Sequence, residues 1–155
     1  MDRQCKVQRG ELSPLALAIR AIVRAVADFP QVNGRFDEEA GVLTLYDAVH
    51  LGVATQTDSG LMVPVLRQAQ TLNLWDCGKL GGIVTTPVIN HPEVAIVGIN
   101  RIVARPKVRD GAVQVRQMMN LSSSFDHRVV DGAVAAGYIQ RVKQLLETPA
   151  TLFIE

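Results

Sequence analysis

The sequence contains few cysteines and few aromatic residues, and its charges nearly cancel. Its 155 residues include two cysteines, and aromatic residues make up 5% of the chain. Cys5 and Cys77 lack metal-site spacing and are too few for a disulfide framework, so we expect free thiols, a reducing cytoplasmic location and no bound metal. The formal net charge of +1 and the absence of a basic block argue against a nucleic-acid partner.

Long apolar runs are also absent. No stretch is long enough to span a bilayer and no N-terminal signal pattern is present, so no membrane association is expected. The apolar stretch 12–27 carries Arg20 and Arg24, which are four residues apart and should form the wetter face of a core helix. Hydrophobic residues make up 48% of the chain, which is enough for one domain, residues 1–155, to bury a core.

Two helices are predicted, one near each end of the chain. Ser13 and Pro14 are typical of an N-cap followed by proline at the first helical position, and this helix should run to about Asp28. The apolar spacing over 133–147 predicts a second helix, which Pro149 ends.

Strand signals fill the region between these helices. Apolar and β-branched segments predict strands at 42–46, 50–55, 61–66, 83–84 and 94–102. Asp110-Gly111 predicts a hairpin over 108–118. The order of elements indicates an α+β sandwich with a mixed β-sheet and helices on one side.

The most informative segment is 122–132, with the sequence SSSFDHRVVDG. It offers the imidazole of His127 and, four residues later, the carboxylate of Asp131, followed by Gly132. Imidazole has an unperturbed pKa near neutrality, so it can accept a proton from a weak acid and return it. The hydroxyl residues before it and the glycine after it predict a tight turn. On these residues alone, a structural histidine is the commoner interpretation.

The residue pattern of this motif, His-Arg-x-x-Asp-Gly near the C-terminus, is shared with a known family. Together with further blocks it resembles the dihydrolipoamide acyltransferases, the E2 cores of the 2-oxoacid dehydrogenase complexes, and is most similar to the bacterial branched-chain type. The family shares its fold with chloramphenicol acetyltransferase, so the resemblance implies a chloramphenicol-acetyltransferase-like two-layer sandwich. The supporting blocks are Phe29–Asn33, His50–Pro64, Gly81–Ile96 and Met118–His127.

The resemblance implies transfer of an acyl group, of the branched-chain type, from dihydrolipoamide to coenzyme A. His127 would be the general base that deprotonates the incoming thiol, since the thiolate is the nucleophile. Asp131 would shape the site and help hold the imidazole. Both thiols are substrates, and no metal is involved.

By position, the resemblance also implies coenzyme A contacts at Ser13, Gln56, Asn100 and Ile102. Ser13 has an equally good alternative role as the helix N-cap. Gln56 stands where many relatives carry an acid. Asn100 and Ile102 would contact the coenzyme through backbone groups at the end of a buried strand.

The same resemblance implies partners. Family members form homotrimers with the active site between neighbours, and the trimers build a larger cage. The E1 and E3 components of the complex are then expected partners, together with a lipoyl domain from another chain or segment. The apolar tail 151–154 is a candidate for contacts between trimers.

The chain departs from the family in two places, so the domain is expected to be incomplete. We expect that the family's N-terminal arm, which carries an arginine partner of Asp131, is missing. After Cys77, roughly 30 residues of one helix-plus-strand unit are missing. That strand carries a Ser or Thr donor to the oxyanion, and losing one such donor typically costs on the order of 10²–10³ in rate. We also expect no lipoyl or subunit-binding domain within residues 1–155.

Several alternatives stay open at this point. The internal gap is explained by a degenerate gene, by a subset of a longer chain, or by replacement of the donor by Ser122–Ser124 or Thr85–Thr86. The alternative function is a shortened, non-catalytic E2-like core or assembly subunit. A free-standing acetyltransferase resembling the chloramphenicol enzyme is a third, since it shares the His and Asp pattern.

Overall fold

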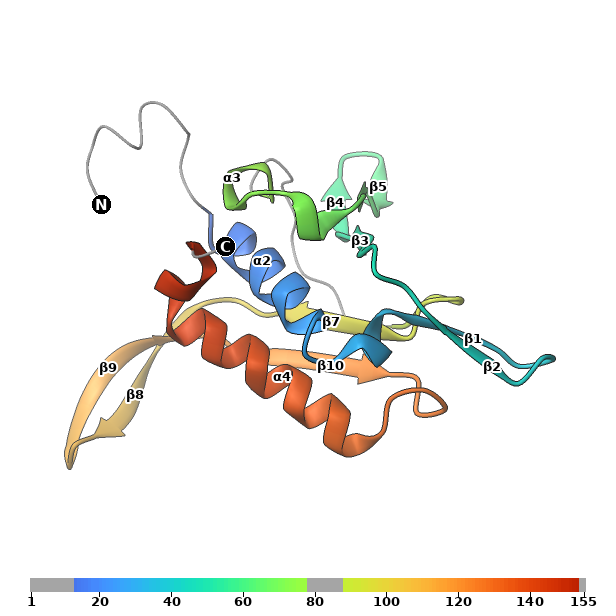
Figure 1. The fold of residues 1–155 in the computed structure, drawn as a ribbon. Helices are drawn as coiled ribbons and strands as arrows, with labels where there is room; N and C mark the ends of the chain where they lie inside the picture. Colours follow the sequence, from blue (N-terminus) through green and yellow to red (C-terminus); the bar gives the residue numbers. More distant parts are fainter. Residues whose placement is uncertain (1–12, 78–87, 154–155) are drawn as a thin grey trace.

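The computed structural model describes residues 13–77 and 88–153. Two helices, α2 (Pro14–Val26) and α4 (Gly132–Glu147), pack together against the strand pair β7 (Ala95–Ile99) and β10 (Leu121–Phe125) (Figure 1). The α+β class, with helices on one side of the strands, is as predicted. The strand predicted at 83–84 lies outside the described residues.

The other strands form four antiparallel pairs around this body. They are β1 (Gly34–Asp37) with β2 (Val42–Leu45), β3 (Leu51–Gly52) with β6 (Val65–Leu66), β4 (Thr55–Thr57) with β5 (Gly60–Met62), and β8 (Val103–Arg109) with β9 (Ala112–Met118). The short helices are η1 (Pro30–Asn33), η2 (Ala69–Thr71), α3 (Leu74–Cys77) and η3 (Pro149–Phe153). β7 and β10 are also antiparallel, so the parallel pairing of a mixed sheet does not occur between the described strands.

Local chemistry explains where these elements begin. The Ser13 hydroxyl accepts a hydrogen bond from the Ala16 N–H at 3.2 Å, and Pro14 opens α2, as predicted. The predicted hairpin turns at Asp110 and Gly111, whose φ angles of 52° and 78° suit an Asp-Gly turn, although its strands begin at Val103, earlier than expected.

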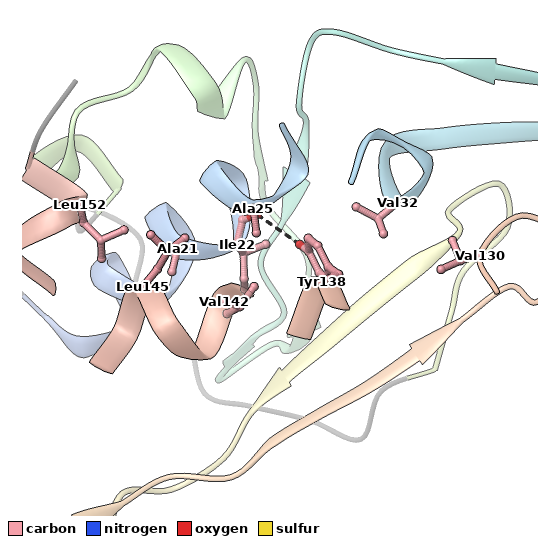
Figure 2. Packing of buried hydrophobic residues seen from close by; sticks show 9 residues of the cluster. All are labelled: Ala21, Ile22, Ala25, Val32, Val130, Tyr138, Val142, Leu145 and Leu152. Atoms are coloured by element: carbon pink, nitrogen blue, oxygen red, sulfur yellow. Dashed lines mark hydrogen bonds between the residues drawn. The ribbon is translucent and has the colours of Figure 1, made fainter. Parts of the chain in front are cut away.

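The main core lies between α2, α4 and one face of the β7–β10 ladder (Figure 2). Tyr138 is its centre: its hydroxyl donates to the Ile22 carbonyl at 3.2 Å, and its ring meets Phe29 and Phe125 edge to face, each at 6.1 Å between centroids. Burial raises the pKa of Tyr138, so its phenol stays neutral. The other buried members are Ala21, Ile22, Ala25, Val32, Val130, Val142, Leu145 and Leu152.

One expectation about exposure is wrong. Arg20 is buried, with 8% of its surface exposed, because a second apolar cluster covers that side of α2. Its guanidinium donates to the carbonyls of Gln70 and Leu72 at 3.3 and 3.0 Å, which ties η2 to the helix. Arg24 is exposed, as predicted. In the C-terminal tail, Leu152 packs into the chain's own core, although Phe153 stays 44% exposed.

Candidate active site

The loop 126–131 joins β10 to α4 and carries the sequence motif. The Asp126 carboxylate binds the Arg128 guanidinium through both oxygens, with the shortest contact, from Nη2, at 2.7 Å, and it also accepts the Arg128 N–H at 3.0 Å. The Asp126 carbonyl accepts from Val129 and Val130, and Val130 is buried to 1% exposure. The tight turn is as predicted.

The same arginine ties the loop to the β1–β2 hairpin. Arg128 Nη1 lies 2.9 Å from Glu38 Oε1, and the guanidinium lies over the Phe36 ring, 5.5 Å from its centroid. The hydrogen bond from Arg128 lowers the pKa of Asp126 to about 2, so that carboxylate stays ionised. Glu38 and Phe36 are site residues that sequence reasoning missed; the acidic turn at 37–39 was the available signal.

His127 stands between these anchors with its side chain exposed. It has no hydrogen-bond partner among the described residues, so the ring is open to an incoming group rather than packed in hydrocarbon. Asp131 does not hold the imidazole. Its Oδ1 accepts the Val134 N–H at 2.8 Å and caps α4, which fixes the end of the loop instead. No arginine pairs with Asp131 in the described part of the chain.

A cavity of about 720 Å³ lies elsewhere, and neither His127 nor Asp131 lines it. It runs along β7, all five of whose residues contribute to its wall, while no residue of β10 does. It therefore lies at the edge of β7 that faces away from β10. Ile19 and Ile22 of α2, Val53 and Val63 make much of the remaining wall apolar.

The four predicted coenzyme A residues are scattered. Ser13 caps α2, and Gln56 is exposed on β4, where its amide donates to the Thr57 carbonyl at 3.3 Å. Asn100 and Ile102 lie between β7 and β8, both exposed. Among the described residues, no hydrogen bond joins any two of the six predicted site residues.

The β7–β10 ladder separates His127 from Asn100 and Ile102. His127 follows β10 at the end where Phe125 pairs with Ala95, whereas Asn100 and Ile102 follow β7 at the end where Ile99 pairs with Leu121. With a rise of about 3.4 Å per residue, the two ends of the ladder are roughly 14 Å apart. One protomer therefore does not bring His127 together with Asn100 and Ile102.

Two other kinds of site have no support in the described residues. Residues 13–77 and 88–153 contain no group of three His, Cys, Asp or Glu side chains placed to hold a metal ion. Over the same residues, no helix has the length and apolar character needed to cross a membrane.

Sequence comparison relates the chain to the catalytic domains of known acyltransferases. The family model for "2-oxoacid dehydrogenases acyltransferase (catalytic domain)" matches residues 1–77 and 74–154. The lipoamide acyltransferase component of the branched-chain alpha-keto acid dehydrogenase complex of Pseudomonas aeruginosa is 55% identical over 179 residues, with 96% of this chain and 42% of that protein covered. A pyruvate dehydrogenase acetyltransferase component of Staphylococcus aureus is 35% identical, with the same coverage.

Solved structures agree with this assignment. The dihydrolipoamide acetyltransferase of Azotobacter vinelandii is 31% identical, with a TM-score of 0.81 and coverage of 93% of this chain and 72% of that one. The cubic core of the pyruvate dehydrogenase multienzyme complex is 29% identical, with a TM-score of 0.82 and coverage of 97% and 74%. These neighbours confirm the predicted chloramphenicol-acetyltransferase-like α+β fold.

The comparisons also reveal how the chain differs in length from its relatives. It spans 42% of the length of the Pseudomonas aeruginosa protein. Since 96% of 155 residues is about 149, the alignment of 179 positions holds about 30 that have no counterpart here. The two stretches of the family match meet at residues 74–77. With near-complete family coverage, high identity and a shared fold, the chain belongs to the family of 2-oxoacid dehydrogenase acyltransferase catalytic domains.

Proposed function

We propose that this domain transfers an acyl group between dihydrolipoamide and coenzyme A, with His127 as the general base and a branched-chain acyl group as the preferred cargo. The observation that carries the proposal is an exposed imidazole on an anchored loop, in a chain 55% identical to a lipoamide acyltransferase component of a branched-chain complex. The free thiol of the buried Cys77 fits the reducing cytoplasm expected for such a complex.

In the proposed reaction, the main task of the chain is to position the reacting groups. The His127 imidazole takes the proton from the coenzyme A thiol, and the thiolate attacks the thioester carbonyl of acyl-dihydrolipoamide. The tetrahedral intermediate then collapses, the carbon–sulfur bond to dihydrolipoamide breaks, and the departing thiolate recovers the proton from the imidazolium. Asp126 with Arg128 on one side, and Asp131 on the other, hold the loop that presents this ring.

Asp131 acts in this scheme as a positioning residue. The Azotobacter vinelandii structure addresses a serine, a histidine and an asparagine in the catalytic mechanism, and that asparagine is four positions after the histidine. Asp131 has the same spacing from His127. Asparagine and aspartate are both good N-caps, so either residue can fix the start of α4.

We further propose that the active form is a homotrimer within a larger cage, served by E1 and E3 components and by a lipoyl domain from another chain or segment. The cubic-core neighbour supports assembly, and the separation of His127 from Asn100 and Ile102 supports a site shared between protomers. Coenzyme A would then contact Ser13, Gln56, Asn100 and Ile102 from more than one chain.

A second candidate function is that of a non-catalytic assembly subunit. The two-part family match and the roughly 30 unmatched positions support a domain that is incomplete near residue 77, where the oxyanion donor was expected. Of the possible substitutes, Ser122 donates to the Gly98 carbonyl at 3.5 Å, which occupies its hydroxyl, while Thr85 and Thr86 lie outside the described residues.

One assay separates the two candidates. Acyl transfer from acyl-coenzyme A to free dihydrolipoamide is measured with the wild-type chain and with His127→Ala, because positioned general bases contribute typically about 10²–10⁴-fold. We expect His127→Ala to lower kcat by that factor while its mass and melting temperature stay unchanged. Equal rates for the two proteins would overturn the catalytic proposal. Assembly of the wild type with no turnover would favour the assembly subunit.

A further inference from the structure

The position of the His127 ring depends on the loop that carries it. The ring has no hydrogen-bond partner among the described residues, and Asp131 caps α4 instead of holding it. The orientation of the imidazole is therefore set by the backbone to which it is attached. The contacts that fix this backbone decide where the ring points.

The two ends of the loop are held by its neighbours in the chain. The Asp126 N–H donates to the Val94 carbonyl at 2.9 Å, which continues the β7–β10 ladder. Towards α4, Val130 is buried in the main core, with 1% of its surface exposed. Between these two points, His127 and Arg128 are exposed, so an attachment to another element matters most there.

The Arg128 guanidinium makes that attachment, and three groups surround it. On one edge, its Nε and Nη2 donate to the Asp126 carboxylate at 3.0 and 2.7 Å. On another, Nη1 lies 2.9 Å from Glu38 Oε1 of the β1–β2 hairpin. The flat face lies over the Phe36 ring of the same hairpin, 5.5 Å from its centroid. Contacts on two edges and one face leave the planar group little freedom to rotate or slide.

The acceptor on the hairpin is itself held in place. Asp37 Oδ1 accepts the N–H groups of Glu39 and Ala40 at 3.1 and 3.0 Å. Gly41 follows with a φ of 63°, a conformation that glycine adopts readily. These contacts fix the turn between β1 and β2, in which Glu38 lies.

The root of the hairpin is joined to the core. Asn33 Nδ2 donates to the carbonyls of Tyr46 and Ala48 at 2.6 and 3.2 Å, which ties the two ends of the β1–β2 pair together. Val32, the residue before Asn33, is buried in the main core. From there the hairpin extends away from the packed helices (Figure 1). Its contact with Arg128 therefore connects the loop to the core by a second route.

We propose that Glu38 is a positioning residue for acyl transfer: through Arg128, and with Phe36 against the guanidinium, it holds the loop so that His127 points at the reacting thiol. This role rests on the proposed function. Glu38 is 75% exposed and Arg128 47%, and exposed ion pairs contribute little to folding stability. The rate is more sensitive to geometry, since a displacement of about 1 Å can cost about 10²-fold. A loss of rate at an unchanged melting temperature is therefore the signature of this role.

Matched variants test the role by steady-state kinetics. Glu38→Ala removes the acceptor of Arg128 and should lower kcat roughly tenfold, with little change in the KM for acyl-coenzyme A or in the melting temperature. Glu38→Gln keeps an acceptor oxygen and should recover most of that loss. Glu39→Ala is the control, because this neighbouring acid has no ion pair among the described residues, and it should keep the wild-type rate. Phe36→Leu should lower kcat more than Phe36→Tyr, which retains an aromatic face.

A double-mutant cycle tests whether Glu38 acts through Arg128. In an Arg128→Met background the guanidinium is absent, so Glu38→Ala should cause no further loss of kcat. Hydrogen–deuterium exchange of residues 126–131 gives a second readout that needs no turnover. Exchange there should be faster in Glu38→Ala than in the wild type, and unchanged in Glu39→Ala.

Three results would overturn the proposal: wild-type kcat or wild-type loop exchange in Glu38→Ala, an equal effect of Glu39→Ala, or an undiminished effect of Glu38→Ala in the Arg128→Met background. Failure of the proposed function gives a different result, a wild type that is no faster than His127→Ala. The exchange of residues 126–131 then decides by itself whether Glu38 holds the loop.

Discussion

The two edges of β7 differ sharply. One edge is paired with β10 over five residues, and helices α2 and α4 cover the ladder, whereas the other edge lines a cavity of about 720 Å³. His127 and its loop belong to the covered side, since they join β10 to α4. The difference teaches that the loop with the base is held by packed elements of its own chain, whereas the other edge of β7 borders a cavity.

The largest predicted effect contrasts a buried residue of the packed side with an exposed residue of the cavity wall. Tyr138→Ala removes a buried ring, its two edge-to-face contacts and a hydrogen bond, and should lower the free energy of unfolding by about 3–5 kcal/mol. Val88 lines the cavity, as Tyr138 also does, but it is 67% exposed, so Val88→Ala should stay within about 0.5 kcal/mol of the wild type. Urea denaturation measures both. Equal losses would show that packing against the ladder does not decide the size of the effect.

A pair of glycines sharpens the comparison within α4. A Cβ at Gly137 would lie 2.8 Å from a carbon of the Phe29 ring, so Gly137→Ala should destabilise the chain by about 1–3 kcal/mol despite the better helix propensity of alanine. Gly132→Ala meets nothing within 4 Å and should be neutral or slightly stabilising. A Gly137→Ala chain as stable as the wild type would mean that the ring of Phe29 is free to move.

The junction of loop and helix should give a smaller effect. Asp131→Ala removes the N-cap of α4 and should cost about 1 kcal/mol. Asp131→Asn keeps a capping oxygen, so it should retain stability and most of the acyl-transfer rate. Thermal unfolding and kcat are measured on both. If Asp131→Asn loses as much activity as His127→Ala, the carboxylate has a role beyond capping.

The smallest expected effect is a loss of folding stability at acidic pH. The pKa of Asp126 falls from 3.8 to about 2 on folding because Arg128 stabilises its carboxylate. The stabilisation is therefore fully present above pH 4 and is lost as the pH falls toward 2. The wild type should lose stability over that range, and Asp126→Asn should lose less. Parallel curves for the two proteins would show that the ion pair does not order the loop.

Local sequence signals predicted the elements that depend on neighbouring residues. Ser13-Pro14 marked the start of α2, and Asp110-Gly111 marked a turn that only such residues adopt readily. The capping role of Asp131 was also readable, since an acid directly before a helix of α4's pattern is a typical N-cap. Asp131 was instead predicted to be a partner of the imidazole.

The same local signals could not predict contacts between residues far apart in the sequence. Arg20 was predicted on a solvent-exposed face because the spacing of apolar residues indicates a single buried face. In the structure, apolar clusters cover α2 on two sides. The link from Arg128 to Glu38 joins residues 90 positions apart, and no local pattern encodes it. The separation of His127 from Asn100 and Ile102 likewise follows from strand pairing, because the antiparallel β7–β10 ladder places them at opposite ends.

Chemical rescue tests most directly the claim that His127 is the general base. The His127→Ala chain keeps the anchored loop but lacks the imidazole, so it should transfer acyl groups about 10²–10⁴-fold more slowly than the wild type. Free imidazole added to the assay should restore part of that rate, since residue 127 is exposed and a small base can reach its place. A His127→Ala chain as fast as the wild type, or one that imidazole does not rescue, would contradict the account.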